Sequence, residues 1–312
     1  MEHKRIKFID LAKGLTMLCV LIGHIDTYDW IKSSIYSFHM PIFFILSGYF
    51  LHERFEVFRL KKMVRSILIP YFIIGIGLWL TKSFINGNFK DILRVPLVVY
   101  KWNSDVISVG AIWFLPVIFL GKLWLLFTLR YKYKYTLLLG CACISLLFTK
   151  LTNIVIPFGI QQAIVCAPYL MIGHEMKFLR VFDRSYRKDF IISIGIVCLF
   201  YANTVNVAMR VNSMSVFNYL SASLISFFII YSLSIIEKSN NYIVHITCDL
   251  FTWCGRYSLI ILCVHSIESQ FGWFSLPHNL FIFEIIIRWA YIVFITWCCT
   301  KIWITKRIFN LI

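Results

Sequence analysis

The first long apolar run of the sequence carries two ionisable residues, Lys13 and His24, which lie eleven positions apart. At 3.6 residues per turn this separation is close to three helical turns, so both side chains share one helix face about 16 Å apart. Asp10 lies one turn before Lys13, where it would either pair with Lys13 or favour the start of the helix. Ionisable groups inside a membrane helix are costly and indicate a functional site by default.

Other polar residues at the ends of apolar runs are expected at the same two depths when the N-terminus is placed in the cytoplasm. The basic residues expected near the depth of Lys13 are Lys62 and Arg65, before the third run, and Arg256, at the start of the ninth. The residues expected near the depth of His24 are His39, Trp113 and His265. Taken alone, Lys13 could extend to lipid headgroups and His24 could hydrogen-bond a neighbouring helix. A basic layer beneath a histidine cluster favours a functional site instead.

These two layers suit different chemistry. A basic inner mouth suits a phosphate-bearing anion that enters from the cytoplasm. An imidazole near the outer side suits a general base for a hydroxyl, or a nucleophile that accepts an acyl group. Coenzyme A thioesters join the two ends, because their phosphates and their acyl group are separated by a long arm. Two alternatives stay open: a transporter or flippase for an anionic or glycan substrate, and a non-enzymatic assembly subunit whose polar residues hold helices together.

The elements that would position these residues are membrane helices. Of the 312 residues, 60% are hydrophobic and only 15% are charged, which excludes an ordinary soluble globular protein. About ten runs reach the length that spans a bilayer, and they are continuously apolar rather than alternating as in a barrel. The expected runs are 9–27, 36–52, 66–85, 109–128, 134–151, 157–174, 189–207, 216–236, 251–270 and 280–304. The predicted fold is an all-α polytopic integral membrane bundle, with residues 1–312 as a single domain and no appended soluble domain.

The formal net charge of +16 is predicted to set topology rather than to bind nucleic acid. Most Lys and Arg residues fall in loops on the side of the N-terminus, which places both termini in the cytoplasm by the positive-inside rule. The ten cysteines have no metal-ligand spacing, so no metal is predicted. Glu284 and Arg288, four residues apart in the last run, are expected to form an intramembrane ion pair.

Five blocks of the sequence resemble the membrane-bound acyltransferase-3 family, whose members O-acylate sugars of surface polysaccharides and related envelope molecules. They run in the family's order over about 9–265. The first holds Lys13 and His24 with a basic-x10-His spacing, and the second runs from His39 through an aromatic pair to Ser47 and Gly48. The others are Lys62 to Arg65 followed by Ile69-Pro70-Tyr71, Trp113-Phe114-Leu115, and Gly255-Arg256-Tyr257-Ser258-Leu259 with His265.

The resemblance implies an acyl-CoA donor, most simply acetyl-CoA, and an acceptor hydroxyl on an envelope glycan or its lipid-linked precursor. It implies His24 as the catalytic residue with His39 beside it, and acyl-CoA contacts by Lys13, Lys62, Arg65 and Arg256. Supporting roles fall to Asp10, Ser47, Trp113, Tyr257 and His265. A lysine at position 13, where the family also uses arginine, would contact phosphate as a point charge. The expected location is the bacterial cytoplasmic (inner) membrane, and the acyl chain, acceptor sugar and oligomeric state stay open.

Overall fold

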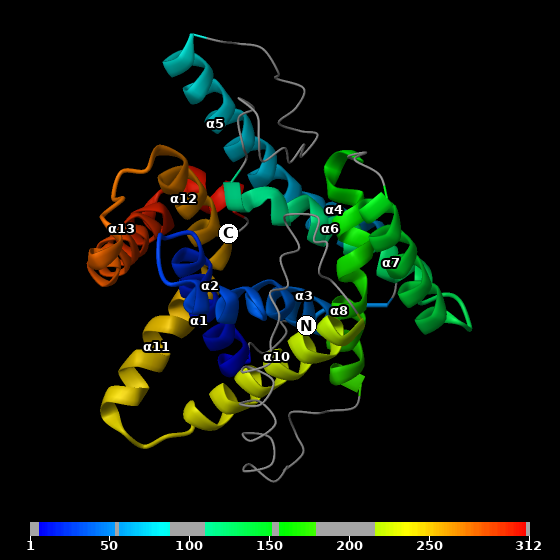
Figure 1. The fold of residues 1–312 in the computed structure, drawn as a ribbon. Coiled ribbons are helices and arrows are strands. Elements are labelled where there is room, and N and C mark those ends of the chain that lie inside the picture. Colours follow the sequence, from blue (N-terminus) through cyan, green and yellow to red (C-terminus); the bar gives the residue numbers. More distant parts are fainter. Residues whose placement is uncertain (1–5, 54–55, 88–109, 152–155, 179–215, 310–312) are drawn as a thin grey trace.

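A computed structural model describes residues 6–53, 56–87, 110–151, 156–178 and 216–309 of the chain (Figure 1). These residues form helices and connecting turns, with no strand among them. The predicted all-α class is therefore confirmed for this part of the chain. Helices lie at every predicted apolar range except 189–207, which falls outside the described residues.

The helices follow one another along the chain with short connections. The first half contains α1 (Lys7–Gly23), α2 (Asp29–Tyr36), α3 (His39–Tyr49), α4 (Val57–Met63), the π-helical turn η1 (Val64–Leu68), α5 (Ile69–Asn86), the 3-10 turn η3 (Gly110–Trp113), α6 (Phe114–Thr128) and α7 (Lys134–Leu151). The second half contains the 3-10 turn η4 (Pro157–Gly159), α8 (Ile160–Phe178), α10 (Val216–Ile236), α11 (Tyr242–Arg256), α12 (Ser258–Phe271), the 3-10 turn η6 (His278–Leu280), α13 (Phe281–Lys301) and α14 (Trp303–Ile308).

Several of these helices have the length and composition of membrane spans. Within the described ranges, four continuous helical segments qualify: Val57–Ile85, Gly110–Thr128, Tyr219–Ile236 and His278–Lys301. The pair α11 and α12 would add a fifth span if it is counted as one broken helix. By contrast, α3 has 11 residues, or about 16 Å at 1.5 Å per residue, which is about half of a hydrocarbon core. The predicted range 36–52 therefore holds a half-length helix.

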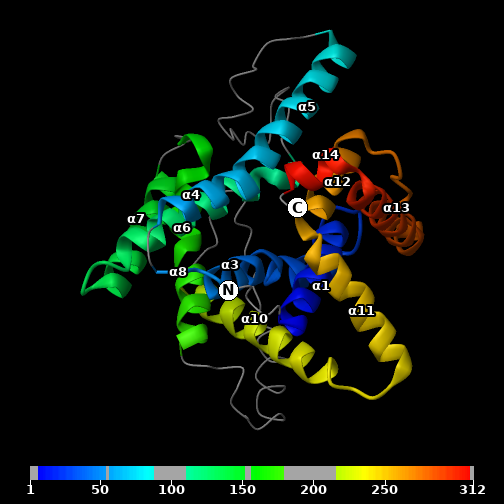
Figure 2. The same cartoon turned by 180° about the vertical axis from the view of Figure 1, so that it is seen from behind.

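The predicted continuous span over 251–270 is wrong. The chain bends by 78° between α11 and α12. Tyr257 leaves the helical conformation at this point, with φ −106° and ψ 19°, and it ends one helix and precedes the next. Apolar periodicity continues across the break, so hydrophobicity alone does not reveal it. The bend gives α12 a different direction from α11, as Figure 2 shows from behind.

Two reciprocal glycine contacts fix the helices of the site. α1 crosses α11 where Gly14 meets the backbone of Phe251, and Gly255 meets the backbone of Asp10. A Cβ atom added to Gly14 would lie 1.9 Å from the Phe251 carbonyl oxygen, and one added to Gly255 would lie 1.7 Å from that of Asp10. Small residues that let backbones approach are typical of helix interfaces in membranes.

The second contact joins α3 to α8. A Cβ atom at Gly48 would lie 1.9 Å from the carbonyl oxygen of Leu170, and one at Gly173 would lie 1.8 Å from that of Ile45. α1 packs in turn against α2, α3, α10, α11, α12 and α13. The helix that carries Lys13 and His24 therefore lies in the interior of the bundle, with its C-terminal end between α2, α12 and α13.

Candidate functional site

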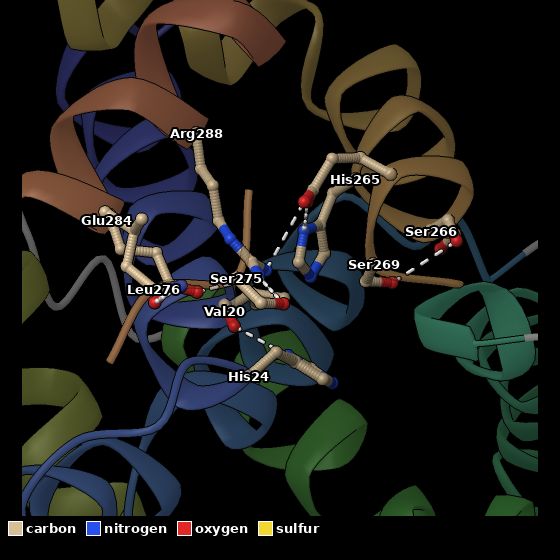
Figure 3. A network of polar contacts seen from close by, with 10 residues as sticks. Val20, His24, His265, Ser266, Ser269, Ser275, Leu276, Glu284 and Arg288 are labelled. Atoms are coloured by element: carbon tan, nitrogen blue, oxygen red, sulfur yellow. Dashed lines mark hydrogen bonds and ion pairs between the residues drawn. The ribbon is translucent and has the colours of Figure 1, made fainter. Parts of the chain in front are cut away.

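His24 directly follows α1 and is exposed, unlike most residues of that helix. Its Nδ1 atom lies 2.7 Å from the carbonyl oxygen of Val20 (Figure 3). A carbonyl oxygen only accepts hydrogen bonds, so Nδ1 is the donor and carries the proton. In the neutral imidazole this leaves a lone pair on Nε2. The helix end thus holds the ring by one nitrogen and leaves the other able to accept a proton.

A second imidazole lies against the first. The ring of His265, on α12, is 5.1 Å from that of His24 between centroids, in an edge-to-face arrangement. His265 is only 1% exposed, so His24 is the accessible member of the pair. Figure 3 shows His265 directed toward His24 from the neighbouring helix. The 78° bend at Tyr257 aims α12 so that these two histidines meet.

His39 reaches the same end of α1 through Tyr36. His39 begins α3 and is buried, and its Nδ1 donates a hydrogen bond to the carbonyl oxygen of Ile35 at 2.9 Å. Its ring contacts that of Tyr36 edge-to-face at 4.9 Å, and the Tyr36 hydroxyl donates to the carbonyl oxygen of Gly23 at 3.2 Å. His39 lies within electrostatic range of His24. The sequence analysis missed Tyr36, whose only signal is its position three residues before His39.

A buried ion network lies behind the two histidines. Arg288 Nη2 is 2.7 Å from Glu284 Oε1, which confirms the ion pair predicted on this helix. Arg288 Nη1 also lies 3.4 Å from Glu268 Oε1 on α12, and Glu268 Oε2 lies 3.7 Å from His265 Nδ1. The pairing of Glu268 with Arg288 was not predicted. Its only sequence signal is that Glu268 follows His265 by three residues, on the same face of a helix.

The same network holds the loop between α12 and α13. Arg288 Nη2 donates to the hydroxyl of Ser275 at 3.2 Å, and the backbone amide of Leu276 donates to Glu284 Oε2 at 3.0 Å. α12 ends at Gly272, whose φ of +61° lies in the left-handed region that favours glycine. The loop thus leaves α12 by a tight turn and is fixed to α13 beside the histidines.

Lys13 lies nearer the other end of α1, half-buried among mixed partners. Its ammonium group is 3.6 Å from the carboxylate of Asp10 and 5.2 Å from the ring centroid of Phe50. Lys122, on α6, lies within electrostatic range of Lys13. Two ammonium groups share one neighbouring carboxylate, which gives this end of α1 a surplus of positive charge. The sequence analysis placed Lys122 inside a span without a role.

Comparison with known proteins was made against families, curated proteins and solved structures. The family model described as an acyltransferase domain matches residues 6–304, nearly the whole chain. The chain belongs to the acyltransferase-3 family. Neither the curated proteins nor the solved structures gave a match. The predicted resemblance is thus confirmed, and together with the apolar helices it makes the protein a membrane acyltransferase.

The other predicted site residues of this acyltransferase lie around the two ends of α1. Lys62, Arg65 and Arg256 are exposed. Arg65 belongs to the π-helical turn η1, which packs against α6, the helix of Lys122. Arg256 is the last residue of α11, at the bend, and lies within electrostatic range of Asp249. The structure therefore puts Arg65 on an element that packs against the helix of Lys122, and Arg256 on the helix that crosses α1.

Three further residues of the family blocks have positions in the packing. Trp113 is buried at the end of η3, a turn that packs against α12. Tyr257 forms the bend between α11 and α12, with its ring 5.1 Å from that of Trp253. Ser47 directly precedes Gly48, the glycine that meets α8. Among the residues that the structure describes, no group of three or more His, Cys, Asp or Glu side chains could hold a metal ion.

Proposed function

We propose that this acyltransferase moves an acyl group, most simply acetyl, from acyl-CoA to a hydroxyl of a cell-envelope glycan or its lipid-linked precursor. The observation that carries the proposal is the imidazole of His24. It is exposed, its Nδ1 proton is held by Val20, and its Nε2 is left to accept a proton. A histidine in this state is suited to general-base catalysis near neutral pH.

In the proposed reaction, Nε2 of His24 accepts the proton of the acceptor hydroxyl. The hydroxyl oxygen forms a bond to the acyl carbon, the carbon–sulfur bond breaks, and its electron pair stays on the sulfur. The proton then passes from His24 to the thiolate, which restores the imidazole. The same Nε2 lone pair would instead attack the acyl carbon if the reaction passed through an acyl-histidine. His39 and Tyr36 support the ring through the contact of Tyr36 with Gly23.

At the donor end, Lys13 would contact the phosphates of acyl-CoA, with Lys62, Arg65 and Arg256 as further cations. The surplus positive charge around Lys13 and Lys122 supports this assignment, because a buried surplus charge is stabilised by an anion. Eleven residues of helix separate Lys13 from His24, about 16 Å, a distance of the order of an extended cofactor arm. A continuous passage between the two ends is a prediction of this proposal.

The proposal also includes the orientation of the chain. We propose about ten spans, with both termini in the cytoplasm of a bacterium and the bundle in its inner membrane. Acyl-CoA would then enter from the cytoplasm beside Lys13, while the glycan acceptor would reach His24 from the outer side. Labelling of single cysteines placed near each terminus, in intact cells and in opened cells, tests this orientation.

The experiment for the proposed reaction uses the purified full chain in liposomes with radiolabelled acetyl-CoA and isolated envelope glycan. The wild type is expected to move label to the glycan, and His24→Ala is expected to lose this transfer while it still folds and inserts. His245→Ala is the matched control, because His245 is an exposed histidine on α11 paired with Asp249. Full transfer by His24→Ala would overturn the proposal. Glycan translocation without thioester cleavage would indicate a flippase instead.

A further inference from the structure

The ion network behind His265 carries a surplus of negative charge. Glu268, Glu284 and Arg288 are each at most 4% exposed, so water does little to stabilise their charges. Two carboxylates share one guanidinium through contacts of 3.4 Å and 2.7 Å. If all three groups are ionised, their net charge is −1. A buried charge without a partner is costly, so the surplus favours a positive charge on the nearest group that can accept a proton.

The nearest such groups are the two imidazoles. Glu268 Oε2 lies 3.7 Å from His265 Nδ1, and the His265 ring lies 5.1 Å from the His24 ring. Among the described residues, neither nitrogen of His265 nor either carboxylate oxygen of Glu268 has a hydrogen-bond partner that satisfies it. Glu268 is therefore not consumed by structural hydrogen bonds, and its charge is directed at His265. The order in space is carboxylate, buried imidazole, accessible imidazole.

We propose that Glu268 is a positioning residue that acts through His265 on His24. Its carboxylate draws the proton of His265 to Nδ1, which fixes that ring against His24. The surplus negative charge also stabilises the imidazolium that His24 becomes when it accepts the hydroxyl proton. Arg288 and Glu284 hold Glu268 in place and set the net charge. This inference rests on the proposed function, because it assigns the network a part in the same proton transfer.

Charged and titratable groups approach this pair from each neighbouring helix that bears on it. Those facing His24 are His265 on α12, His39 on α3, Arg288 on α13 and Tyr36 on α2. Those facing Glu268 are His265, Arg288 and Tyr291. Glu268 thus brings the ionised carboxylate that reaches His24 through a neighbouring ring, and its removal changes the sign of the local surplus.

The test compares pH–rate profiles of acetyl transfer to glycan by the full chain in liposomes. Glu268→Gln keeps the shape of the side chain and removes its charge. The imidazolium of His24 then loses a stabilising neighbour, so the acid limb of the profile is expected to move to lower pH by about one unit. We also expect kcat to fall about tenfold, part of the roughly 10²–10⁴-fold that general-base catalysis contributes.

A second variant separates charge from packing. Glu284→Gln combined with Arg288→Met removes one charge of each sign, so the net charge stays −1 and Glu268 stays ionised. Its acid limb is expected within a few tenths of a unit of the wild type, even if the variant is less stable. Glu175→Gln is the control for losing a carboxylate elsewhere, since Glu175 pairs with Lys134 and Tyr135 on other helices.

The outcomes distinguish this inference from the function on which it rests. If the wild type transfers no label, or if His24→Ala transfers it fully, the proposed function fails. If transfer depends on His24 but Glu268→Gln keeps the wild-type acid limb, Glu268 has no part in the proton transfer and the inference is overturned. Equal shifts in Glu268→Gln and in the double variant would also overturn it, because they would follow from damaged packing rather than from charge.

Discussion

Gly14→Ala tests whether the crossing of α1 and α11 positions the site. The new Cβ atom would lie 1.9 Å from the carbonyl oxygen of Phe251 and 2.8 Å from its carbonyl carbon. Ordinary contact begins near 3.4 Å, so the two helices must separate by 3.4 − 1.9 = 1.5 Å at this point. The obstructing atoms belong to backbone, so no side-chain rotation relieves the clash.

The expected cost follows from that displacement. Overpacking costs about 1–3 kcal/mol, and a clash with backbone belongs at the upper end of that range. Alanine recovers about 1 kcal/mol of helix propensity over glycine, so the net loss of stability is about 2 kcal/mol. Because α1 carries both Lys13 and His24, a shift of about 1 Å at the reacting groups is expected to reduce transfer about 100-fold.

The measurement pairs thermal unfolding in detergent, followed by tryptophan fluorescence, with acetyl transfer in liposomes. The matched control is Gly77→Ala, because Gly77 lies inside α5 and a Cβ atom there meets nothing within 4 Å. Gly77→Ala should be as stable as the wild type or slightly more stable, with full activity. If Gly14→Ala matched Gly77→Ala in both unfolding temperature and transfer rate, the close crossing would have no part in the site.

Further expected outcomes follow from single contacts at the site and in the fold. Lys13→Ala should raise the KM for acetyl-CoA more than Lys13→Arg does, since Arg keeps the charge; equal, wild-type-like values in both would mean that Lys13 only extends to lipid headgroups. Tyr36→Phe loses the hydrogen bond to the Gly23 carbonyl, worth about 1 kcal/mol, and should lower kcat about fivefold in steady-state assays; unchanged kcat would remove Tyr36 from the site. Asn241→Ala removes the side chain that caps α11 and should cost about 1 kcal/mol in thermal unfolding, whereas an unchanged unfolding temperature would contradict the capping role.

The sequence was sufficient to predict the class of the fold and the position of most helices. Long apolar runs must form helices in a bilayer, because each backbone polar group needs a partner within its own segment. The same argument cannot find the break at Tyr257, since the residues on both sides stay apolar. It also assigned a full span to 36–52, where α3 is only 11 residues long.

The candidate site was predictable where its residues share one helix. The spacing of Lys13 and His24, and that of Glu284 and Arg288, follow from the 3.6-residue period. Contacts between helices were not predictable in the same way. The edge-to-face contact of His24 with His265 and the pairing of Arg288 with Glu268 depend on the direction of α12, which the bend sets.

The central claim is that the imidazole of His24 accepts the hydroxyl proton during acyl transfer. The most direct measurement is the rate of label transfer from acetyl-CoA to glycan by His24→Ala, with and without added imidazole. The account predicts a rate near background that rises with imidazole concentration, while acetyl-CoA binding stays at the wild-type level. Transfer at the wild-type rate by His24→Ala without imidazole would contradict it.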